Sequence, residues 1–280
     1  MYSNTDEHLQ YLSKLANYFR RQTIKIIYKA QSGHTGGSLS CAEILTVLYF
    51  NEMKIDPANS DWDDRDRFVA SKGHCAPILY AVLAKRGFFP ESELFTLRTL
   101  GSPLQGHPNK STTKGIEIST GSLGMGLSVG LGMAISARLL GKSFYTYVLM
   151  GDGELQEGQI WESAMSASKF CVDNCIAIID HNGVQLDGKV DEIMPLGDLV
   201  MKWRSFGWNV IEADGHNISE LITAINRAKD TKKTPSVIIA KTVKGKGVSF
   251  MENNYKWHGG VISKVDYESA MRELGGEADD

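Results

Sequence analysis

The sequence contains no run of about 18 apolar residues, and no basic segment leads into an apolar one near its start. We therefore expect a chain that neither spans nor enters a membrane and that resides in the cytoplasm. A formal net charge of −3 and a pI near 6.2 give no bulk electrostatic reason to bind nucleic acid. Small molecules or other proteins are the expected partners.

Cysteine is scarce, and its spacing does not suit a metal. The sequence has four cysteines, without the paired spacing of zinc ligands and without a disulfide pattern: Cys41, Cys75, Cys171 and Cys175. Cytoplasmic proteins keep their thiols reduced, and free cysteines are commonly buried. We interpret all four as reduced core thiols.

Two common phosphate-binding motifs are also absent. The segment "GDGELQEGQ" (151–159) lacks the Lys-Ser/Thr pair of a Walker A loop, and no G-x-G-x-x-G opens the helix expected after it. A plain nucleotide-binding domain is therefore disfavoured.

The 280 residues have the composition of a globular chain, with 42% hydrophobic and 22% charged residues. Apolar residues at steps of three and four predict helices over 6–30, 42–53, 76–87, 126–141, 156–170, 218–229 and 265–273. Continuous apolar runs predict strands over 145–150, 175–180, 208–213 and 236–243.

The alternation of strands and helices favours one α/β domain over residues 1–280. Near-continuous apolar strands are typical of a parallel sheet that helices cover on both faces. Gly87 is expected to end the helix at 76–87 as a C-cap. Gly130 and Gly132 weaken the helix at 126–141, which indicates close packing against a neighbouring backbone.

A Gly-Asp-Gly turn stands where the strand at 145–150 ends, and Asn182 follows the next strand, 30 residues after Asp152 (182 − 152). That interval matches one strand-helix-strand unit, so Asp152 and Asn182 are expected side by side at the ligand-binding edge of the sheet. With a nearby backbone carbonyl, such as that of Val184, they offer hard oxygen ligands to Mg²⁺ or Ca²⁺. The alternative is that both segments are ordinary tight turns.

Gly151-Asp152-Gly153 followed by Asn182 resembles the signature by which proteins bind thiamine diphosphate and its metal. Further stretches narrow the resemblance to the transketolase family, in the family's order: "SGHTGGSLS" (32–40), "SKGHCAPILYA" (71–81), "GHP" (106–108), "STGSLGMGLSVGLGMA" (119–134), "GDGELQEGQ" (151–159) and "WHGG" (257–260). The resemblance implies the thiamine diphosphate-binding fold, specifically the domain that holds the diphosphate.

Five of the seven histidines adjoin a glycine: His34, His74, His107, His216 and His258. The resemblance implies that all of these except His216 are catalytic, lining the channel to the cofactor's thiazolium ring and donating hydrogen bonds to substrate oxygens. It also places His74 and His258 near the diphosphate. Several imidazoles with a pKa near the working pH would be useful for the proton movement in such chemistry.

The other histidines receive structural interpretations. His8 is expected on the exposed face of the first helix, and His181 precedes Asn182 and orients it at most. His216, in "DGHN", is expected to make a structural turn.

Three further segments bear on the cofactor. Within "ISTGSLGMG" (118–126), the resemblance implies that Gly121, Ser122 and Leu123 face the cofactor, although a plain helix start also explains the turn. It assigns Glu157 to the cofactor site and to a proton relay at a subunit contact, whereas the positive end of a helix dipole explains that carboxylate equally well. We interpret the basic segment "KTVKGKG" (241–247) as a solvated loop rather than an aid to the diphosphate.

Family chains carry a second domain, which binds the aminopyrimidine, and a third one, and the sequence has room for only the first. The resemblance thus implies the amino-terminal subunit of a split transketolase. A carboxyl-terminal subunit would supply the pyrimidine-binding domain and the activating glutamate, with two copies of each chain. The expected reaction transfers a two-carbon ketol unit from a ketose phosphate to an aldose phosphate. The segments "GHTGG" and "KGHC" differ from the patterns that are commoner in the family. These differences put in question which ketose donor the protein prefers.

Two other functions stay open. A 2-oxo acid dehydrogenase α-type subunit shares Gly-Asp-Gly and the later asparagine, but the "GHP" and "WHGG" stretches argue against it. A non-catalytic scaffold or regulatory subunit would retain the fold without the reaction.

Overall fold

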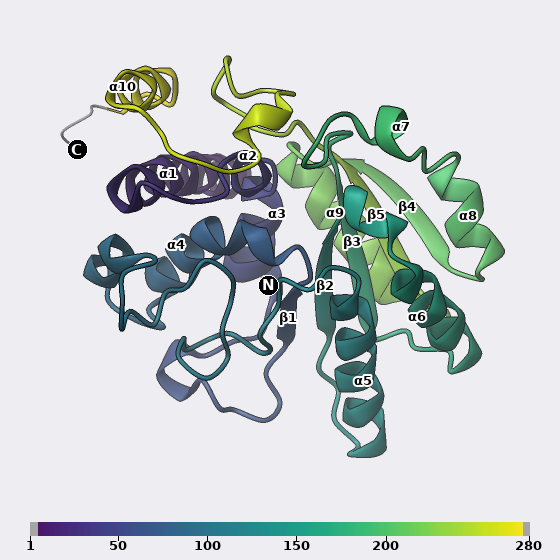
Figure 1. The fold of residues 1–280 in the computed structure, drawn as a ribbon. Coiled ribbons are helices and arrows are strands. Elements are labelled where there is room, and N and C mark those ends of the chain that lie inside the picture. Colours follow the sequence, from purple (N-terminus) through teal and green to yellow (C-terminus); the bar gives the residue numbers. More distant parts are fainter. Residues whose placement is uncertain (1–4, 277–280) are drawn as a thin grey trace.

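The computed structural model describes residues 5–276, and a sheet of five parallel strands forms its centre (Figure 1). The order across the sheet is β1-β2-β3-β5-β4. The strands are β1 (Arg67–Ala70), β2 (Thr146–Gly151), β3 (Cys175–His181), β4 (Asn209–Asp214) and β5 (Ser236–Lys241). The predicted parallel sheet is confirmed.

The central strands are apolar along their length because both of their faces are buried. In β2, Tyr147 and Leu149 belong to one core, and Val148 and Met150 belong to the other. Successive side chains of a strand point to opposite faces, so a strand covered on both sides needs apolar residues throughout. This is why the sequence shows continuous rather than alternating apolar runs.

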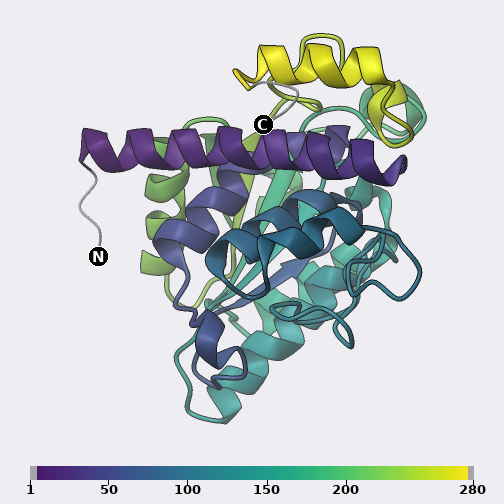
Figure 2. The ribbon, with the colours of Figure 1, turned by 90° about the vertical axis from the view of Figure 1, so that its left-hand side faces the viewer.

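Helices cover each face of the sheet (Figures 1 and 2). Those that contribute to the first core are α1, α2, α3, α4, α9 and α10, and those that contribute to the second are α5, α6, α7 and α8. Across the outer side of the first layer, α10 lies beside α1, where Tyr28 stacks on Tyr267 with ring centroids 4.2 Å apart (Figure 2). The helices are α1 (Asp6–Ala30), α2 (Gly36–Leu39), α3 (Ala42–Val47), α4 (Ala76–Arg86), α5 (Met125–Leu139), α6 (Gly158–Lys169), α7 (Val190–Ile193), α8 (Leu199–Ser205), α9 (Ile218–Asp230) and α10 (Lys264–Glu273).

The long helices begin and end close to the predicted positions. The side chain of Thr5 accepts a hydrogen bond from the backbone of His8 and caps the start of α1, which ends before Gln31, a residue in the left-handed conformation (φ 50°). Gly87 (φ 94°) ends α4 as predicted. The helix predicted over 42–53 is α-helical only as far as Val47 and then widens into a π turn, Leu48–Glu52.

Glycine in α5 has the predicted packing role at one position and not at the other. A Cβ atom on Gly130 would overlap Cγ2 of Val148 in β2, so only glycine lets the helix approach the sheet this closely. A Cβ on Gly132 would meet nothing within 4 Å. The expectation of close packing is therefore wrong for Gly132, which faces solvent.

One strand and three α-helices were not predicted, and one cysteine was wrongly placed. β1, α2 and α7 have four residues each and α8 has seven, which is too short to display a clear period. Cys171 is exposed, because it follows α6 in a left-handed turn (φ 49°), whereas the other three cysteines are buried; all four thiols are free. Among the helices of residues 5–276, none is long and apolar enough to cross a membrane.

The two glycines of α5 offer a matched test of this packing. Gly130→Ala should lower the free energy of unfolding by about 1–2 kcal/mol, because overlap with Val148 outweighs the better helix propensity of alanine. Gly132→Ala should raise it by about 0.5–1 kcal/mol, because only the propensity changes. Urea unfolding of both variants measures the difference, and equal effects at the two positions would contradict the packing argument.

Candidate functional site

The polar residues singled out in the sequence collect at the carboxyl ends of the strands. The chain leaves β1 toward α4 on one face of the sheet and leaves β2 toward α6 on the other. Divergent connections of this kind open a crevice between neighbouring strands, where ligands bind in open α/β sheets. The Gly-Asp-Gly turn after β2 stands at that crevice.

A buried ion pair anchors the crevice. Lys72, just after β1, donates to Asp180 near the end of β3, and their side chains are 1% and 0% exposed. Asp180 also accepts hydrogen bonds from Ser40, at 2.6 Å, and from Thr242. Although burial opposes ionisation, Lys72 holds the pKa of Asp180 below its usual range. One carboxylate therefore joins four chain segments.

The structure brings the predicted metal ligands together. Asp152, Asn182 and Val184 line one cavity. Backbone amides of Gly153, at 2.8 Å, and Gly183 donate to the two carboxylate oxygens of Asp152. Burial raises the pKa of Asp152. A carboxylate, an amide oxygen and a carbonyl form the oxygen donor set that suits Mg²⁺ or Ca²⁺.

Glu154 was not predicted as a site residue, yet it shapes the Gly-Asp-Gly turn. Its carboxylate, buried behind the turn, accepts hydrogen bonds from the hydroxyl of Ser71 and from the amides of Gly124, at 2.9 Å, and Gly151, at 3.1 Å. Burial raises its pKa. This side chain ties the end of β1 to the start of α5 and to the turn after β2.

Lys244 contradicts the interpretation of 241–247 as a solvated loop. Its side chain is buried and lines the same cavity as Asp152. The ammonium donates to the carbonyl of Val184 at 2.8 Å and to Nδ1 of His258 at 2.9 Å, and none of its hydrogen-bond or ion-pair partners within residues 5–276 is a carboxylate. Burial and the charge of Lys72 lower its pKa to about 8. A buried cation without a carboxylate partner favours an anionic ligand.

The cavity has a volume of about 250 Å³. Nine of the site residues predicted from the sequence line it: His74, Leu123, Gly151, Asp152, Gly153, Glu157, Asn182, Val184 and His258. Four predicted residues lie outside its lining: His34, His107, Gly121 and Ser122. A Cβ on Gly121 would come within 3.0 Å of the ring of His107, so this glycine lies directly behind that imidazole.

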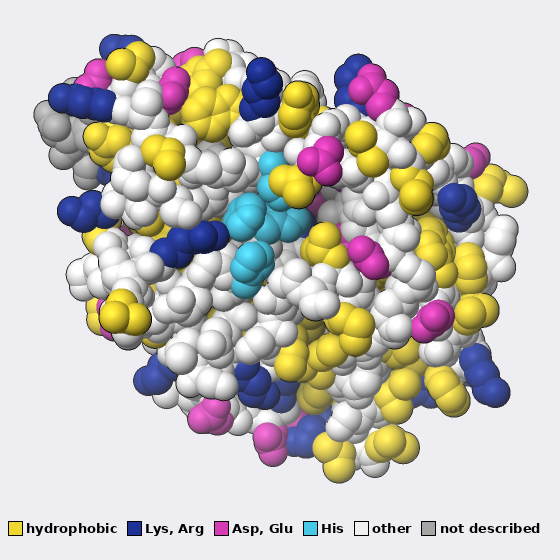
Figure 3. Space-filling model, in the orientation of Figure 1, with side chains coloured by type: hydrophobic (Ala, Val, Ile, Leu, Met, Phe, Trp, Pro, Cys, Tyr) yellow, Lys and Arg dark blue, Asp and Glu magenta, His cyan; other side chains and the backbone are white. Residues whose placement is uncertain are grey.

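The four predicted catalytic histidines form one cluster at the molecular surface, visible as a single patch in Figure 3. The ring centroid of His34 is 5.8 Å from that of His74, 5.4 Å from that of His107 and 5.5 Å from that of His258. The rings of His74 and His258 are 5.0 Å apart and adjoin the cavity that contains Asp152. The fold therefore gathers these four histidines from four distant segments of the chain.

In this structure the pKa values of these four imidazoles are lowered rather than near the working pH. Burial and neighbouring cationic groups lower the pKa of His34 to about 4 and that of His258 to about 3. The pKa values of His74 and His107 are also lowered, chiefly by burial. Because an ammonium can only donate, its bond to Nδ1 leaves the ring hydrogen of His258 on Nε2. At neutral pH the cluster is neutral and offers N–H donors.

The remaining predicted positions have mixed outcomes. Glu157 is exposed beside the cavity and precedes α6. His8 is partly buried and lies 2.8 Å from Oδ1 of Asn51, which corrects its placement on an exposed face. His216 takes part in the expected turn, where its amide donates to Oδ1 of Asp214 at 2.8 Å, and its ring also contacts Glu43 and Val243 outside that turn.

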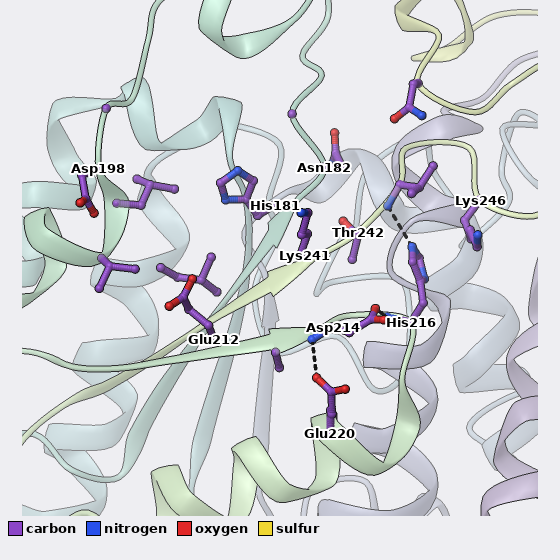
Figure 4. Close-up of a pocket in the computed structure, with 18 residues that line it drawn as sticks. His181, Asn182, Asp198, Glu212, Asp214, His216, Glu220, Lys241, Thr242 and Lys246 are labelled. Carbon is purple, nitrogen blue, oxygen red and sulfur yellow. Dashed lines mark hydrogen bonds between the residues drawn. The ribbon is translucent and has the colours of Figure 1, made fainter.

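A second, larger cavity of about 1130 Å³ lies beyond the ends of β3, β4 and β5 (Figure 4). Its charged lining mixes both signs: it includes Lys241 and Lys246 as well as Asp198, Glu212 and Asp214. Asn182 lines both cavities, so the segment after β3 forms the wall between them.

Comparison with known proteins agrees with this geometry. Residues 12–280 match the family described as transketolase, thiamine diphosphate binding domain. The A-type subunit of the apulose-4-phosphate transketolase of Phocaeicola vulgatus is 46% identical over 255 residues, which are 91% of this chain and 90% of the relative. The 6-deoxy-6-sulfo-D-fructose transketolase subunit SqwG of a Clostridium species is 45% identical over 263 residues, which are 94% of this chain and 96% of the relative.

Solved structures extend the comparison to the fold. The transketolase of Leishmania mexicana superposes with a TM-score of 0.92 at 32% identity and covers 96% of this chain. The present chain spans only 42% of that protein. Fold and sequence together define a thiamine diphosphate-binding domain. The chain belongs to the transketolase family, a family of transferases, and matches single subunits of its split members over nearly their whole length.

The lowered pKa of His258 predicts a pH-dependent stability. In the folded chain its pKa is about 3, whereas an unfolded chain binds the proton near pH 6.5, so acidification between these values favours unfolding. Stability is fully present above pH 6.5 and declines below it. His258→Gln should therefore lose about 1 kcal/mol less than the wild type between pH 7.5 and pH 5, after discounting for solvent screening of a partly exposed ring. Urea unfolding at both pH values measures this, and identical pH dependence in the two proteins would contradict it.

Proposed function

We propose that this chain is the amino-terminal subunit of a split, thiamine diphosphate-dependent transketolase. One observation carries the proposal: hard oxygen ligands, a buried lysine without a direct carboxylate partner among the described residues and a cluster of neutral histidines meet at one crevice of the sheet. The two subunit relatives match the chain over nearly their whole length, which supports residues 1–280 acting as one diphosphate-binding domain. The free, largely buried thiols support a cytoplasmic location.

The donor set fits a metal-bound diphosphate. Asp152, the amide oxygen of Asn182 and the carbonyl of Val184 would hold Mg²⁺, or Ca²⁺ in its place. Lys244 has no carboxylate partner among the described residues and would neutralise part of the diphosphate charge. Gly153 would let the backbone after β2 approach the ligand, while Leu123 and Glu157 border the cavity from the segments before α5 and α6.

The histidine cluster would act on the sugar. Thiamine diphosphate supplies the carbon nucleophile that carries a two-carbon unit between sugars. The neutral rings of His34, His74, His107 and His258 would donate hydrogen bonds to hydroxyl and carbonyl oxygens and pass protons between them. Their depressed pKa values mean that a ring holds a proton taken from a substrate hydroxyl only transiently, and passes it on readily to an oxygen whose basicity rises during the reaction.

An arginine beside the cluster indicates how an anionic sugar would be attracted. The guanidinium of Arg98 is 3.1 Å from the hydroxyl of Ser32 and 3.4 Å from Nδ1 of His34. Its positive charge beside His34 suits the binding of a sugar phosphate. The named substrates of the two relatives differ from each other, so the ketose of this chain is not assigned from them.

The rest of the active centre would come from a carboxyl-terminal subunit. In this proposal the partner contributes the pyrimidine-binding domain and the activating glutamate, and two copies of each chain assemble. The naming of both relatives as subunits supports the existence of a partner. The exposed segment around Gly121, Ser122 and Glu157 would face the cofactor's pyrimidine side at that interface.

Cofactor binding tests the metal assignment. In the mixture with the carboxyl-terminal subunit encoded in the same genome, Asp152→Asn should weaken Mg²⁺-dependent binding of thiamine diphosphate at least about ten-fold, because a charged ligand is lost. Isothermal titration with and without Mg²⁺ measures it. Asp230→Asn, an exposed change at the far end of α9, serves as the control. Unchanged affinity in Asp152→Asn would place the metal elsewhere.

Turnover tests the split-subunit proposal. With thiamine diphosphate and Mg²⁺, the chain alone should not transfer a ketol unit from xylulose 5-phosphate to ribose 5-phosphate, and the mixture should. Apulose 4-phosphate and 6-deoxy-6-sulfofructose serve as further donors. Turnover by the chain alone would refute the half-site assignment. A mixture that binds the cofactor but transfers no ketol unit from any of these donors would contradict the transketolase assignment.

A further inference from the structure

His216 bridges two turns that belong to different strands. It follows β4, and its ring contacts Glu43 of α3 on one side and the segment after β5 on the other. Nδ1 lies 3.0 Å from Oε2 of Glu43. The amide of Val243 donates to Nε2 at 2.9 Å, which is the dashed line at His216 in Figure 4. This ring is therefore a rigid spacer between the helical layer and the turn that carries Lys244.

The partners of His216 fix its tautomer. The carboxylate of Glu43 can only accept, so Nδ1 carries the hydrogen, and the amide of Val243 can only donate, so Nε2 is the acceptor. Although burial opposes ionisation, Arg20 and His216 hold the pKa of Glu43 at about 2, which keeps it an acceptor. Arg20 binds both carboxylate oxygens of Glu43, at 2.7 and 2.6 Å. The orientation of the imidazole is thus set from α1 and α3.

The turn after β4, which contains His216, packs closely against the turn after β5. A Cβ on Gly215 would overlap Cγ2 of Thr242, and the amide of Gly215 donates to the carbonyl of Lys241 at 2.8 Å. Glycine is therefore required where the turn after β4 touches the turn after β5. The contact puts the ring of His216 within reach of the Val243 amide.

Val243 and Lys244 face opposite cavities. Val243 lines the larger cavity with His216, whereas Lys244 lines the smaller one with Asp152 and His258. Displacement of the Val243 amide would move the next residue in the chain, and with it the ammonium that contacts Val184 and His258. The ring of His216 thus supports, from the side of the larger cavity, the residue that lines the smaller one. The smaller cavity is called the cofactor pocket below.

We propose that His216 is a positioning residue that holds Lys244 in the cofactor pocket through the Val243 amide. The inference rests on the proposed function, because it assigns Lys244 to the diphosphate. In this proposal the side chain of His216 contacts neither the cofactor nor the substrate. Its effect on cofactor affinity is therefore expected to pass entirely through Lys244.

A double-mutant cycle tests this route, with Mg²⁺-dependent thiamine diphosphate affinity of the mixed subunits as the readout. His216→Phe should weaken binding about ten-fold in the wild-type background, because the amide loses its acceptor, and less than about two-fold in the Lys244→Met background. His216→Gln, whose side-chain oxygen can replace Nε2 as acceptor, should restore most of the affinity. Ile222→Val, a buried change in α9, controls for general loss of stability.

The outcomes separate this inference from the proposed function. Absence of Mg²⁺-dependent binding in the wild-type mixture would refute the proposed function. Wild-type binding with additive effects of the His216 and Lys244 substitutions, or an equal loss in Ile222→Val, would refute the positioning role. Nitrogen-15 NMR of histidine-labelled chain gives a readout without cofactor: the hydrogen of His216 should reside on Nδ1, and its presence on Nε2 would overturn the inference.

Discussion

The buried pair of Lys72 and Asp180 is the interaction on which the site depends. Two charges withdrawn from water are stable only when their geometry and further hydrogen bonds compensate for lost hydration, and Ser40 and Thr242 provide those bonds. The pair joins the ends of β1 and β3 to the segments that carry α2 and the turn after β5. In the cavity that contains Asp152, the lining residues Gly37, Lys72, Asn182 and Lys244 lie in or directly beside these segments, and the turn after β2 follows the strand between β1 and β3.

Positive charge is distributed unevenly around this pair. Asp180 neutralises Lys72, while Lys244 a short distance away has carbonyls and a neutral imidazole as partners. The lowered pKa values of Lys244, His34 and His258 share one origin, which is burial beside other cationic groups. A multiply charged anion would relieve this repulsion. The same electrostatic arrangement thus explains both the neutral histidines and the affinity proposed for a diphosphate.

Sequence patterns predicted the sheet, the long helices and the chemistry of the Gly-Asp-Gly turn, because strand burial and turn residues leave local signals. They did not reveal Glu154, Asp180 or the burial of Lys244, because a charged residue beside glycines looks the same whether it is solvated or enclosed. The pKa values of the histidines also depend on distances between segments far apart in the chain. Cys171 was misplaced for a related reason, since its exposure is decided by a left-handed turn.

The position of β4 at the border of the sheet has a consequence for solubility. Within residues 5–276 one side of this strand pairs with β5 and the other pairs with no strand. Its exposed residues Glu212 and Asp214 are acidic and point to the same face. A second molecule that approached edge to edge would bring like charges together, which opposes strand addition and aggregation. The acidic border thereby limits the ways in which copies of the chain can associate.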